Sequence, residues 1–531
     1  VNLGREVAAR LTLRVSVAEP LREAPPLFLR EWPLELSPGE EKTFEAEIRE
    51  GDWPAREPEA GWEATVEIVD AEAGGTIDRL SHPVHVWRPS EKPAFVEARD
   101  GGFWLDGKPW KAHGVNYMPS SGVGLADNDA FEHWLGRGPY DPEVIDRDLH
   151  RIRSMGMNAV SIFVYHRSLE SQNLLDFLRR CRELGIRVNQ SLRPGTPMDF
   201  RWSEMRALIE RYRLAQNDTV FAYDLAWEPS HFDHRHQKSY AAAWAEWVMK
   251  RHGNIEEAEK AWGFPAPRDG GAAGGKLDVP PSRQLVEDGP WRQHVRDYRA
   301  FLDDLLREKY AGARRLVRSI DPNHPVSFRM QFAGDPTHNS ESLMPYDFYG
   351  LGDAVDIWEP EAYGRIGDWE KVKPGCFTAA YARLCDPRKP VLWAEMGSSV
   401  WDRRTMAPSP ERLELAARYY IDFYRMLRES GADGVFFWWY PGGFRVNEES
   451  DFGVINPDGT DRRITEVIRA EGSRFLDAPK PPPPSAWLEV DRDTDARGLF
   501  GTYEAVERDY WKAVEGGKTP GLRWKRRPGT R

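Results

Sequence analysis

The first ninety residues follow a short-period pattern of apolar and polar positions. Alternation at every second position occurs in residues 8–17, 43–48, 62–68 and 82–87. This period is typical of strands that bury one face. Turn-forming residues separate the runs, including Ser37-Pro38-Gly39 and Ala73-Gly74-Gly75. We therefore expect an N-terminal β-sandwich of the immunoglobulin-like kind over residues 1–90.

From Phe103 onwards, apolar runs alternate with amphipathic helical segments. We interpret as strands residues 111–118, 158–165, 186–191, 220–228, 325–331, 355–362, 391–396 and 434–439. Helix-period segments lie between them, notably residues 174–184, 295–320 and 410–430. Eight strand–helix units in succession predict a closed (β/α)₈ barrel. An open doubly wound sheet usually carries a glycine-rich phosphate loop after an early strand, and this sequence has none.

The pattern also suggests how the chain is divided. We place the barrel at residues 95–478, with a tryptophan-rich insertion after the fourth strand at residues 231–294. Loops after barrel strands form the active-site face, so the insertion is expected to shape the pocket. Prolines at 479–484 begin a stiff spacer and a C-terminal extension over residues 479–531. The predicted fold class is α/β: a TIM barrel with an N-terminal β-sandwich domain and a short C-terminal extension.

Composition narrows the classes of partner. The formal net charge of −12 argues against a nucleic-acid-binding surface, which needs excess Lys and Arg. No apolar run approaches the roughly 20 residues that span a bilayer. Three cysteines are too few for a disulfide framework, and buried free thiols are expected. No signal peptide is visible, and the sequence leaves open both localisation, secreted or cytoplasmic, and homo-oligomer formation.

Two carboxylates stand at the ends of predicted strands. Glu228 closes the fourth strand in Asp224-Leu225-Ala226-Trp227-Glu228-Pro229, and Glu395 closes the seventh in Trp393-Ala394-Glu395-Met396-Gly397. Catalytic groups of barrel enzymes sit at the carboxyl ends of the strands, and opposite strands meet across one cavity. A facing pair of carboxylates is what glycoside cleavage requires: one protonates the leaving oxygen, and the other attacks the anomeric carbon or activates water.

These segments resemble glycoside hydrolase clan A, which includes family 5 cellulases and mannanases and family 42 β-galactosidases. The resemblance covers roughly residues 103–475. It rests on the segments at 103–117, at Glu228-Pro229, at 389–397, and from Gly431 to Trp438-Trp439. A fifth segment, residues 247–264, is similar to the insertion after strand four in family 42. The resemblance implies a retaining β-glycosidase, most like an exo-acting β-galactosidase, with Glu395 as nucleophile and Glu228 as acid/base.

The same resemblance implies no metal and no cofactor, and a glycoside, oligosaccharide or polysaccharide as substrate. The mechanism needs Glu395 ionised when substrate binds, so we expect a low pKa for it. The residues expected to contact substrate or to orient the carboxylates lie at other strand ends: Asn116, Tyr117, His166, Arg193, Trp227, Glu361, Tyr363, Trp438 and Trp439. Glu359 and Glu361 are rival carboxylates, and His231, Asp233, His234 and His236 are interpreted as a polar substrate loop.

One position departs from the pattern of the clan. Most members carry Asn directly before the acid/base Glu, where it binds the sugar 2-hydroxyl, and this chain carries Trp227. An indole cannot both donate and accept as an amide does. Three alternatives therefore stay open: an endo-acting β-mannanase or glucanase, a non-catalytic carbohydrate-binding barrel, and a metal-dependent hydrolase. The sequence identifies neither the sugar nor the linkage.

Overall fold

A computed structural model describes residues 2–20, 24–54, 61–126, 131–165, 168, 171–192, 200–229, 237–269, 275–340 and 347–528. The chain folds as two compact units, Val1–Arg88 and Pro89–Arg531. Within the described ranges, no helix combines the length and the hydropathy needed to cross a membrane.

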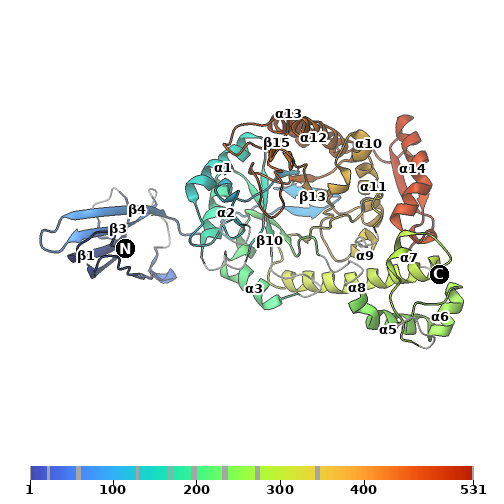
Figure 1. Cartoon of the computed structure of the whole chain (residues 1–531), viewed down its shortest axis with the longest axis horizontal. Coiled ribbons are helices and arrows are strands. Elements are labelled where there is room, and N and C mark those ends of the chain that lie inside the picture. The colour runs from blue at the N-terminus through green and yellow to red at the C-terminus, as the bar shows by residue number, and fades with distance from the viewer. Residues whose placement is uncertain are drawn as a thin grey trace. The chain divides into compact units, whose positions relative to one another are not determined.

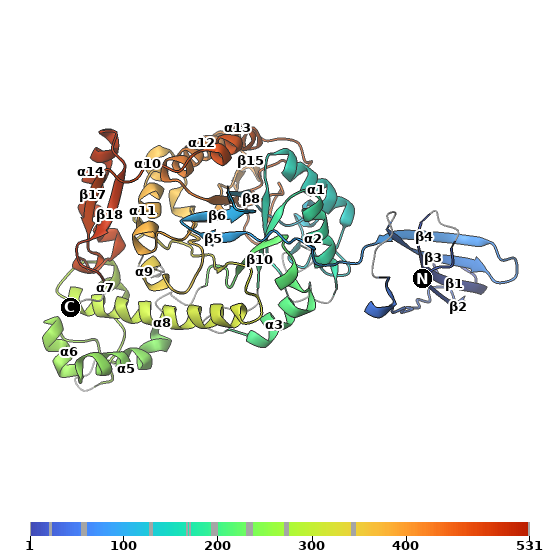
Figure 2. The ribbon, with the colours of Figure 1, turned by 180° about the vertical axis from the view of Figure 1, so that it is seen from behind.

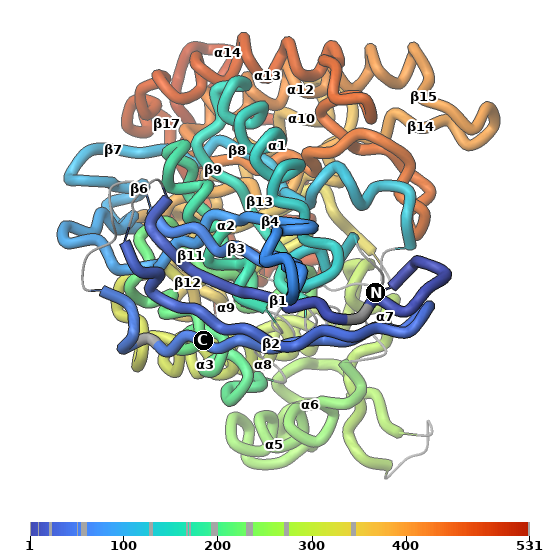
Figure 3. The backbone as a smooth tube through the Cα atoms, turned by 90° about the vertical axis from the view of Figure 1, so that its left-hand side faces the viewer, coloured from blue at the N-terminus to red at the C-terminus, as the bar shows by residue number. Residues whose placement is uncertain are grey.

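The N-terminal unit is an antiparallel sheet with strand order β2-β1-β3-β4 (Figures 1 and 3). Its strands are β1 (Ala8–Ala18), β2 (Phe28–Leu36), β3 (Trp62–Asp70) and β4 (Thr76–Val84). Val17, Leu34 and Leu36 are buried on one face, and Val69, which pairs with Thr12, is buried on the other. This strand-rich antiparallel unit fits the predicted sandwich domain, of which these four strands form one sheet.

Two strand predictions in this unit are corrected. Residues 43–48 form no strand, although Phe44 packs on Trp32 with ring centroids 5.6 Å apart. The apolar side chain is thus partly covered without a hydrogen-bonded ladder. Strand β2 was not predicted, and its Pro33 is tolerated because β2 is an edge strand of the sheet. Strand β4 also begins and ends earlier than the predicted run.

The second unit contains the predicted barrel. A hairpin-like sheet of β5 (Glu97–Arg99), β6 (Gly102–Leu105) and β7 (Lys108–Trp110) leads into it. The parallel strands are β8 (Ala112–Asn116), β9 (Ala159–Ile162), β10 (Arg187–Ser191), β11 (Val220–Asp224), β12 (Val326–Ser327), β13 (Leu392–Met396) and β16 (Gly434–Phe437). Their order in the sheet is β12-β11-β10-β9-β8-β16-β13.

Residues 355–362 occupy the sixth strand position and close the barrel without a regular ladder. On one side, Asp356 N donates to Val326 O at 2.8 Å, and Met330 N donates to Glu359 O at 3.0 Å. On the other side, parallel bridges join Trp358 to Val391 and Glu361 to Glu395. The eight-unit barrel is confirmed, but strands five and six are shorter than predicted. Gln331 interrupts the extended backbone there with a φ of 46°.

Glycine is required where the first two barrel strands approach each other. A Cβ placed on Gly114 of β8 would lie 1.9 Å from the carbonyl oxygen of Ala159 in β9. Only a residue without a side chain fits at this separation. This close approach keeps β8 and β9 in register at the position where Asn116 ends β8.

Helices surround the barrel (Figures 1 and 2). They are α1 (Pro142–Ser154), α2 (Asn173–Glu183), α3 (Trp202–Arg211), α8 (Arg292–Arg318), α9 (Phe348–Leu351), α10 (Trp369–Val372), α11 (Gly375–Cys385), α12 (Pro410–Ser430) and α13 (Arg463–Asp477). Helix α12 has the bounds that the sequence predicted. Ser409 caps its first turn by accepting from Arg412 N, and Gly431 ends it with a φ of 65°.

Two additions extend the barrel. The insertion after β11 carries α5 (Ala241–His252), α6 (Ile255–Trp262) and α7 (Ser282–Val286). The C-terminal extension is a parallel pair, β17 (Ala486–Val490) and β18 (Pro520–Trp524), linked by α14 (Leu499–Glu515). In Figure 2, α14 stands beside β17 and β18. Buried Arg492 anchors this extension through ion pairs with Asp303 of α8 and with Asp347.

Candidate functional site

Three carboxylates converge at the carboxyl ends of the barrel strands. Glu228 follows β11, Glu361 ends the sixth strand segment, and Glu395 lies in β13. One oxygen of each lies within 4.8 Å of the others. Glu361 and Glu395 are buried, at 2% and 1% exposure, whereas Glu228 is half-buried. Glu228 and Glu395, the two predicted catalytic carboxylates, thus lie close together, and Glu361 is a third carboxylate beside them.

Arg329, which follows β12, binds this cluster through its guanidinium. Its Nη1 donates to Glu395 Oε1 at 2.7 Å and to the carbonyl of Ala394 at 3.0 Å. Its Nε donates to Asp224 Oδ2 at 3.1 Å, and Nη2 donates to Asn116 Oδ1 at 2.6 Å and to Ser161 Oγ. All five N–H donors of the guanidinium are thus used. Burial alone would lower the pKa of Arg329, but the charges of Glu395 and Asp224 raise it, so it stays a cation.

Glu395 is the most strongly hydrogen-bonded of the three carboxylates. Besides Arg329, the hydroxyl of Tyr363 donates to its Oε2 at 2.7 Å. Burial nevertheless raises the pKa of Glu395 to about 8. The charge of Glu228 acts in the same direction, whereas Arg329 and Tyr363 lower the pKa. The expected low pKa of Glu395 is therefore wrong. The prediction followed from what the mechanism requires of a nucleophile, whereas the barrel interior removes the water that stabilises the anion.

Glu361 and Glu359 lack donors of their own. Neither oxygen of either side chain has an N–H or O–H partner among the described residues. Burial raises the pKa of Glu361 well above its ordinary value, and the charges of Glu228 and Glu395 raise it further. Burial and the carboxylate of Asp224 do the same for Glu359. Burial thus disfavours the ionised form of both side chains.

Among the described residues, Glu228, Glu361 and Glu395 form a group whose oxygens lie close enough together to surround a metal ion. The buried guanidinium of Arg329 already balances part of their charge. Carboxylates this close can be held together by a cation or by shared protons. Experiment can separate the two arrangements.

Aromatic rings enclose the site next to Glu228. The ring of Trp227 lies 4.4 Å from Phe163 and 5.7 Å from Trp438, measured between centroids. Trp438 and Trp439 follow β16, are buried, and stack on each other at 5.4 Å. Phe163 also contacts the guanidinium of Arg329, 4.7 Å from its centroid. The indole of Trp227 is thus part of an aromatic cluster.

The other predicted site residues fall into three groups. Asn116 and Tyr363 act on Arg329 and Glu395, and Asn116 also donates to the carbonyl of Ala394 at 3.2 Å. Tyr117 is not brought to the carboxylates: its buried ring stacks on Phe177 of α2 at 5.7 Å, and its hydroxyl donates to Asp148 of α1. Its predicted substrate contact is corrected, because successive strand residues point to opposite faces. The remaining residues lie outside the described ranges: His166, Arg193, His231, Asp233, His234 and His236.

Arg329 and Asp224 are the residues of this site that the sequence interpretation missed. Both stand inside runs interpreted as buried strands, where a charged residue is costly unless it has a partner. The same cost that marks the strand-terminal glutamates therefore marks these two positions as well. Ser161 offered no such signal, because serine is common in strands.

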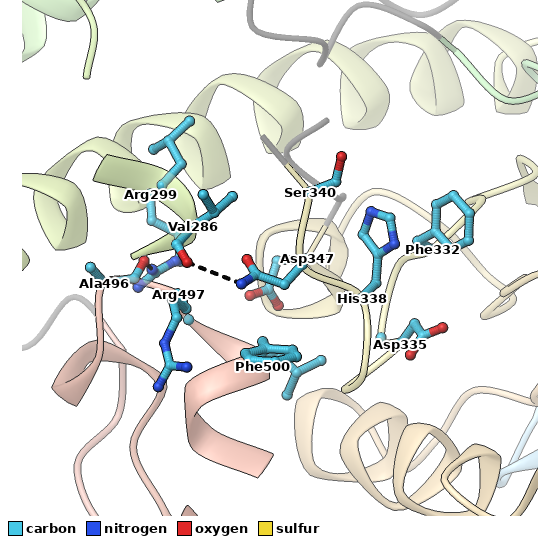
Figure 4. Close-up of a pocket in the computed structure, with 15 residues that line it drawn as sticks. Val286, Arg299, Phe332, Asp335, His338, Ser340, Asp347, Ala496, Arg497 and Phe500 are labelled. Carbon is cyan, nitrogen blue, oxygen red and sulfur yellow. Dashed lines mark hydrogen bonds between the residues drawn. The ribbon is translucent and has the colours of Figure 1, made fainter. Parts of the chain in front are cut away.

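A pocket opens between the loop after β12 and the C-terminal extension (Figure 4). Phe332 and His338 of that loop stack with centroids 4.0 Å apart, and Phe500 of α14 contributes to the lining. None of the three carboxylates lines it. The two carboxylates of its lining, Asp335 and Asp347, are ion-paired with the buried Arg365 and Arg492, so we expect the chemistry at the three glutamates rather than in this pocket.

Comparison with known proteins agrees with this geometry. The family model described as Beta-galactosidase, of glycoside hydrolase family 42, matches residues 200–474, slightly over half of the chain. No curated protein matches the sequence.

Solved structures share the fold at low sequence identity. GH5_18 from Streptomyces cattleya in complex with GlcNAc is 14% identical, with a TM-score of 0.50, over 78% of this chain and 94% of that one. The β-galactosidase of the Antarctic haloarchaeon Halorubrum lacusprofundi is 16% identical, with a TM-score of 0.54, over 77% and 66%. That of Rahnella sp. R3 is 16% identical, with a TM-score of 0.54, over 78% and 64%. The chain belongs to the family 42 β-galactosidases, within clan A of the glycoside hydrolases.

Proposed function

We propose that this protein hydrolyses β-glycosides with retention of anomeric configuration and acts in the exo mode of a β-galactosidase. Glu395 is the nucleophile and Glu228 the acid/base. The observation that carries this proposal is the separation of the two carboxylates, whose nearest oxygens lie within 4.8 Å. Retaining enzymes place the two groups about 5 Å apart, whereas inverting enzymes leave room for a water between them.

The surroundings of the two residues support different tasks. Glu395 is buried and fixed by Arg329 and Tyr363, which hold one carboxylate oxygen each. A fixed, desolvated carboxylate suits attack on the anomeric carbon. Glu228 is half-buried, which suits a group that must reach the leaving oxygen and later a water molecule.

The reaction then has two steps. Glu395 forms a bond to the anomeric carbon while the glycosidic C–O bond breaks and Glu228 gives its proton to the leaving oxygen. Water next attacks the anomeric carbon, its proton passes to Glu228, and the bond to Glu395 breaks. The product keeps the original configuration because the carbon is inverted twice.

The proposed specificity for galactosides rests on the match to the family model. Trp227 puts a different side chain where most of the clan contacts the sugar. In most of the clan an Asn at this position binds the sugar 2-hydroxyl, an interaction that strengthens in the transition state. Here an indole packed on Phe163 and Trp438 takes that place. Another group must therefore bind the 2-hydroxyl, or the substrate presents a different substituent there.

A panel of nitrophenyl glycosides, with the first-formed anomer read by NMR, tests the proposal. We expect turnover of a β-glycoside, with the β-anomer released first. Glu228→Gln and Glu395→Gln should each abolish hydrolysis of unactivated substrates, whereas Glu246→Gln on the exposed face of α5 should not. Azide should restore turnover of Glu395→Gly and yield an α-glycosyl azide. First release of the α-anomer would contradict the retaining mechanism.

A second candidate is a carbohydrate-binding barrel without catalysis, which Trp227 favours because it replaces a transition-state contact of the clan. Calorimetric binding of sugars without turnover over the whole panel would select it. Cleavage of internal bonds in a polysaccharide, seen as rapid loss of viscosity, would instead select an endo-acting mannanase or glucanase.

A further inference from the structure

Glu361 is a buried carboxyl group that the two-carboxylate mechanism does not use. Its side chain is 2% exposed, and its oxygens have no N–H or O–H partner among the described residues. Its backbone N–H donates to Gln331 O at 3.0 Å, and a parallel bridge joins it to Glu395, so the segment itself is fixed. An ionised carboxylate in such a place is strongly disfavoured unless it is paired.

The groups that face Glu361 come from four elements. They are Glu228 after β11, Arg329 after β12, Glu395 in β13 and Tyr363 on its own segment. All five N–H groups of Arg329 donate to other acceptors, and the hydroxyl of Tyr363 donates to Glu395. Neither can therefore donate to Glu361. Among the described residues that face Glu361, the carboxyl group of Glu228 is the neighbour left to form a hydrogen bond with it.

Two carboxyl groups bond to each other only if one of them carries a proton. The nearest oxygens of Glu361 and Glu228 lie within 4.8 Å, and Glu228 is half-buried, so a small movement of its side chain brings the two together. Pairs of this kind hold one proton between them and release it at a pH well above that of an isolated carboxyl group.

We propose that Glu361 is a positioning residue that shares one proton with Glu228 and thereby keeps the acid/base group protonated in the resting enzyme. This rests on the function proposed above. Asp224, the carboxylate next to Glu359, accepts from Arg329 Nε through its Oδ2 at 3.1 Å.

The proton balance of the first step is consistent with this role. In the reactive form, in which Glu395 has lost its proton, Glu395 contributes one negative charge and the proton-sharing pair contributes one. When the proton leaves with the leaving group, Glu228 and Glu361 both become anions, while Glu395 becomes a neutral ester. The negative charge carried by these three side chains is therefore unchanged. Water attack reverses both changes: its proton goes to Glu228, and Glu395 is freed as an anion.

Kinetics of Glu361→Gln test the proposal through leaving-group dependence. An amide at position 361 can donate to Glu228 and stabilise its anion, so the alkaline limb of kcat/KM should move down by about one pH unit or more. Substrates with poor leaving groups should lose about tenfold or more at pH 8, within the range of general acid catalysis. A dinitrophenyl glycoside needs no protonation and should lose less than about threefold. A merely structural role would reduce both substrates equally and leave the limb in place.

Glu246→Gln, which lies on the exposed face of α5 and outside the site, is the control. It should leave the alkaline limb unchanged. Circular dichroism and thermal melting of both variants confirm that they fold. Dependence of wild-type activity on an added divalent cation, or its loss to a chelator, would overturn the proposal in favour of a metal at the same three carboxylates.

An infrared measurement tests the shared proton even if the protein turns over no glycoside. The carbonyl stretch of a protonated carboxyl group should persist at pH 7 in the wild type and should lose the intensity of one group in Glu361→Gln. Glu246→Gln should not change it. If the wild type and Glu361→Gln show the same band, the shared proton is absent. If the band behaves as expected without turnover, the proposed function fails and the proton-sharing pair stands.

Discussion

Replacing Glu395 by glutamine should stabilise the folded barrel at alkaline pH while abolishing catalysis. The pKa of Glu395 is raised from 4.5 to about 8 by burial. In the unfolded chain the group ionises near its ordinary value, so between these two pH values the folded state binds more protons than the unfolded state. The free energy of unfolding contributed by Glu395 is therefore fully present below about pH 4.5 and is lost as the pH rises through about 8.

The size of the effect follows from that shift. Each pKa unit corresponds to about 1.4 kcal/mol, so the full difference is roughly 5 kcal/mol at most. Glu395 is 1% exposed, so solvent does not screen it appreciably. The glutamine carbonyl can still accept from Arg329, and the hydroxyl of Tyr363 can rotate to accept from the amide. Losing the charge-assisted hydrogen bonds costs the Glu395→Gln variant about 1–2 kcal/mol of this gain. Above pH 8 this cost does not depend on pH.

Thermal melting of wild type and Glu395→Gln between pH 5 and pH 9 measures this directly. A domain of this size shifts by about 1 °C per kcal/mol, so the difference in Tm should grow by several degrees in favour of the variant as the pH rises. Exposed Glu246→Gln on α5 is the control and should track the wild type. Parallel curves for Glu395→Gln and wild type would refute the reasoning, because they would mean that Glu395 is ionised at no cost in the folded barrel.

Four further predictions concern single contacts. Arg329→Met removes the buried cation beside Glu395, so the acid limb of kcat/KM should move to higher pH and activity should fall about a hundredfold or more; an unmoved limb would exclude this role. Tyr363→Phe removes one donor to Glu395 and should lower kcat about tenfold with little change in Tm; an unchanged kcat would contradict it. Gly114→Ala places a methyl group against the carbonyl of Ala159, and calorimetry should show a loss of about 3 kcal/mol or a barrel that does not fold. Arg492→Met leaves Asp303 and Asp347 unpaired, costs about 3–5 kcal/mol, and should make the C-terminal extension the first site of limited proteolysis; an unchanged cleavage pattern would count against it.

The barrel could be predicted because its signals are local. Buried parallel strands are apolar runs, and the amphipathic helices between them have caps such as Ser409 and Gly431 at their ends. Prediction was poorest where the structure of a segment depends on elements that are distant in the sequence. Residues 43–48 alternate like a strand but have no ladder, whereas β2 contains a proline that only an edge position tolerates. Alternation shows that one face of a segment is apolar, but not which element covers it.

The sequence by itself determined the two strand-terminal glutamates, the barrel order that brings them together, and the aromatic segment at the eighth strand. Only the tertiary structure decided what surrounds them. The guanidinium of Arg329 binds Asn116, Ser161 and Asp224, which come from three other strands, and it also binds Glu395. The physical reason is that a pKa depends on burial and on charges a few ångströms away in space. Neither quantity is a property of a residue's neighbours in the chain, so the raised pKa of Glu395 and the placement of Glu361 follow from closing the barrel.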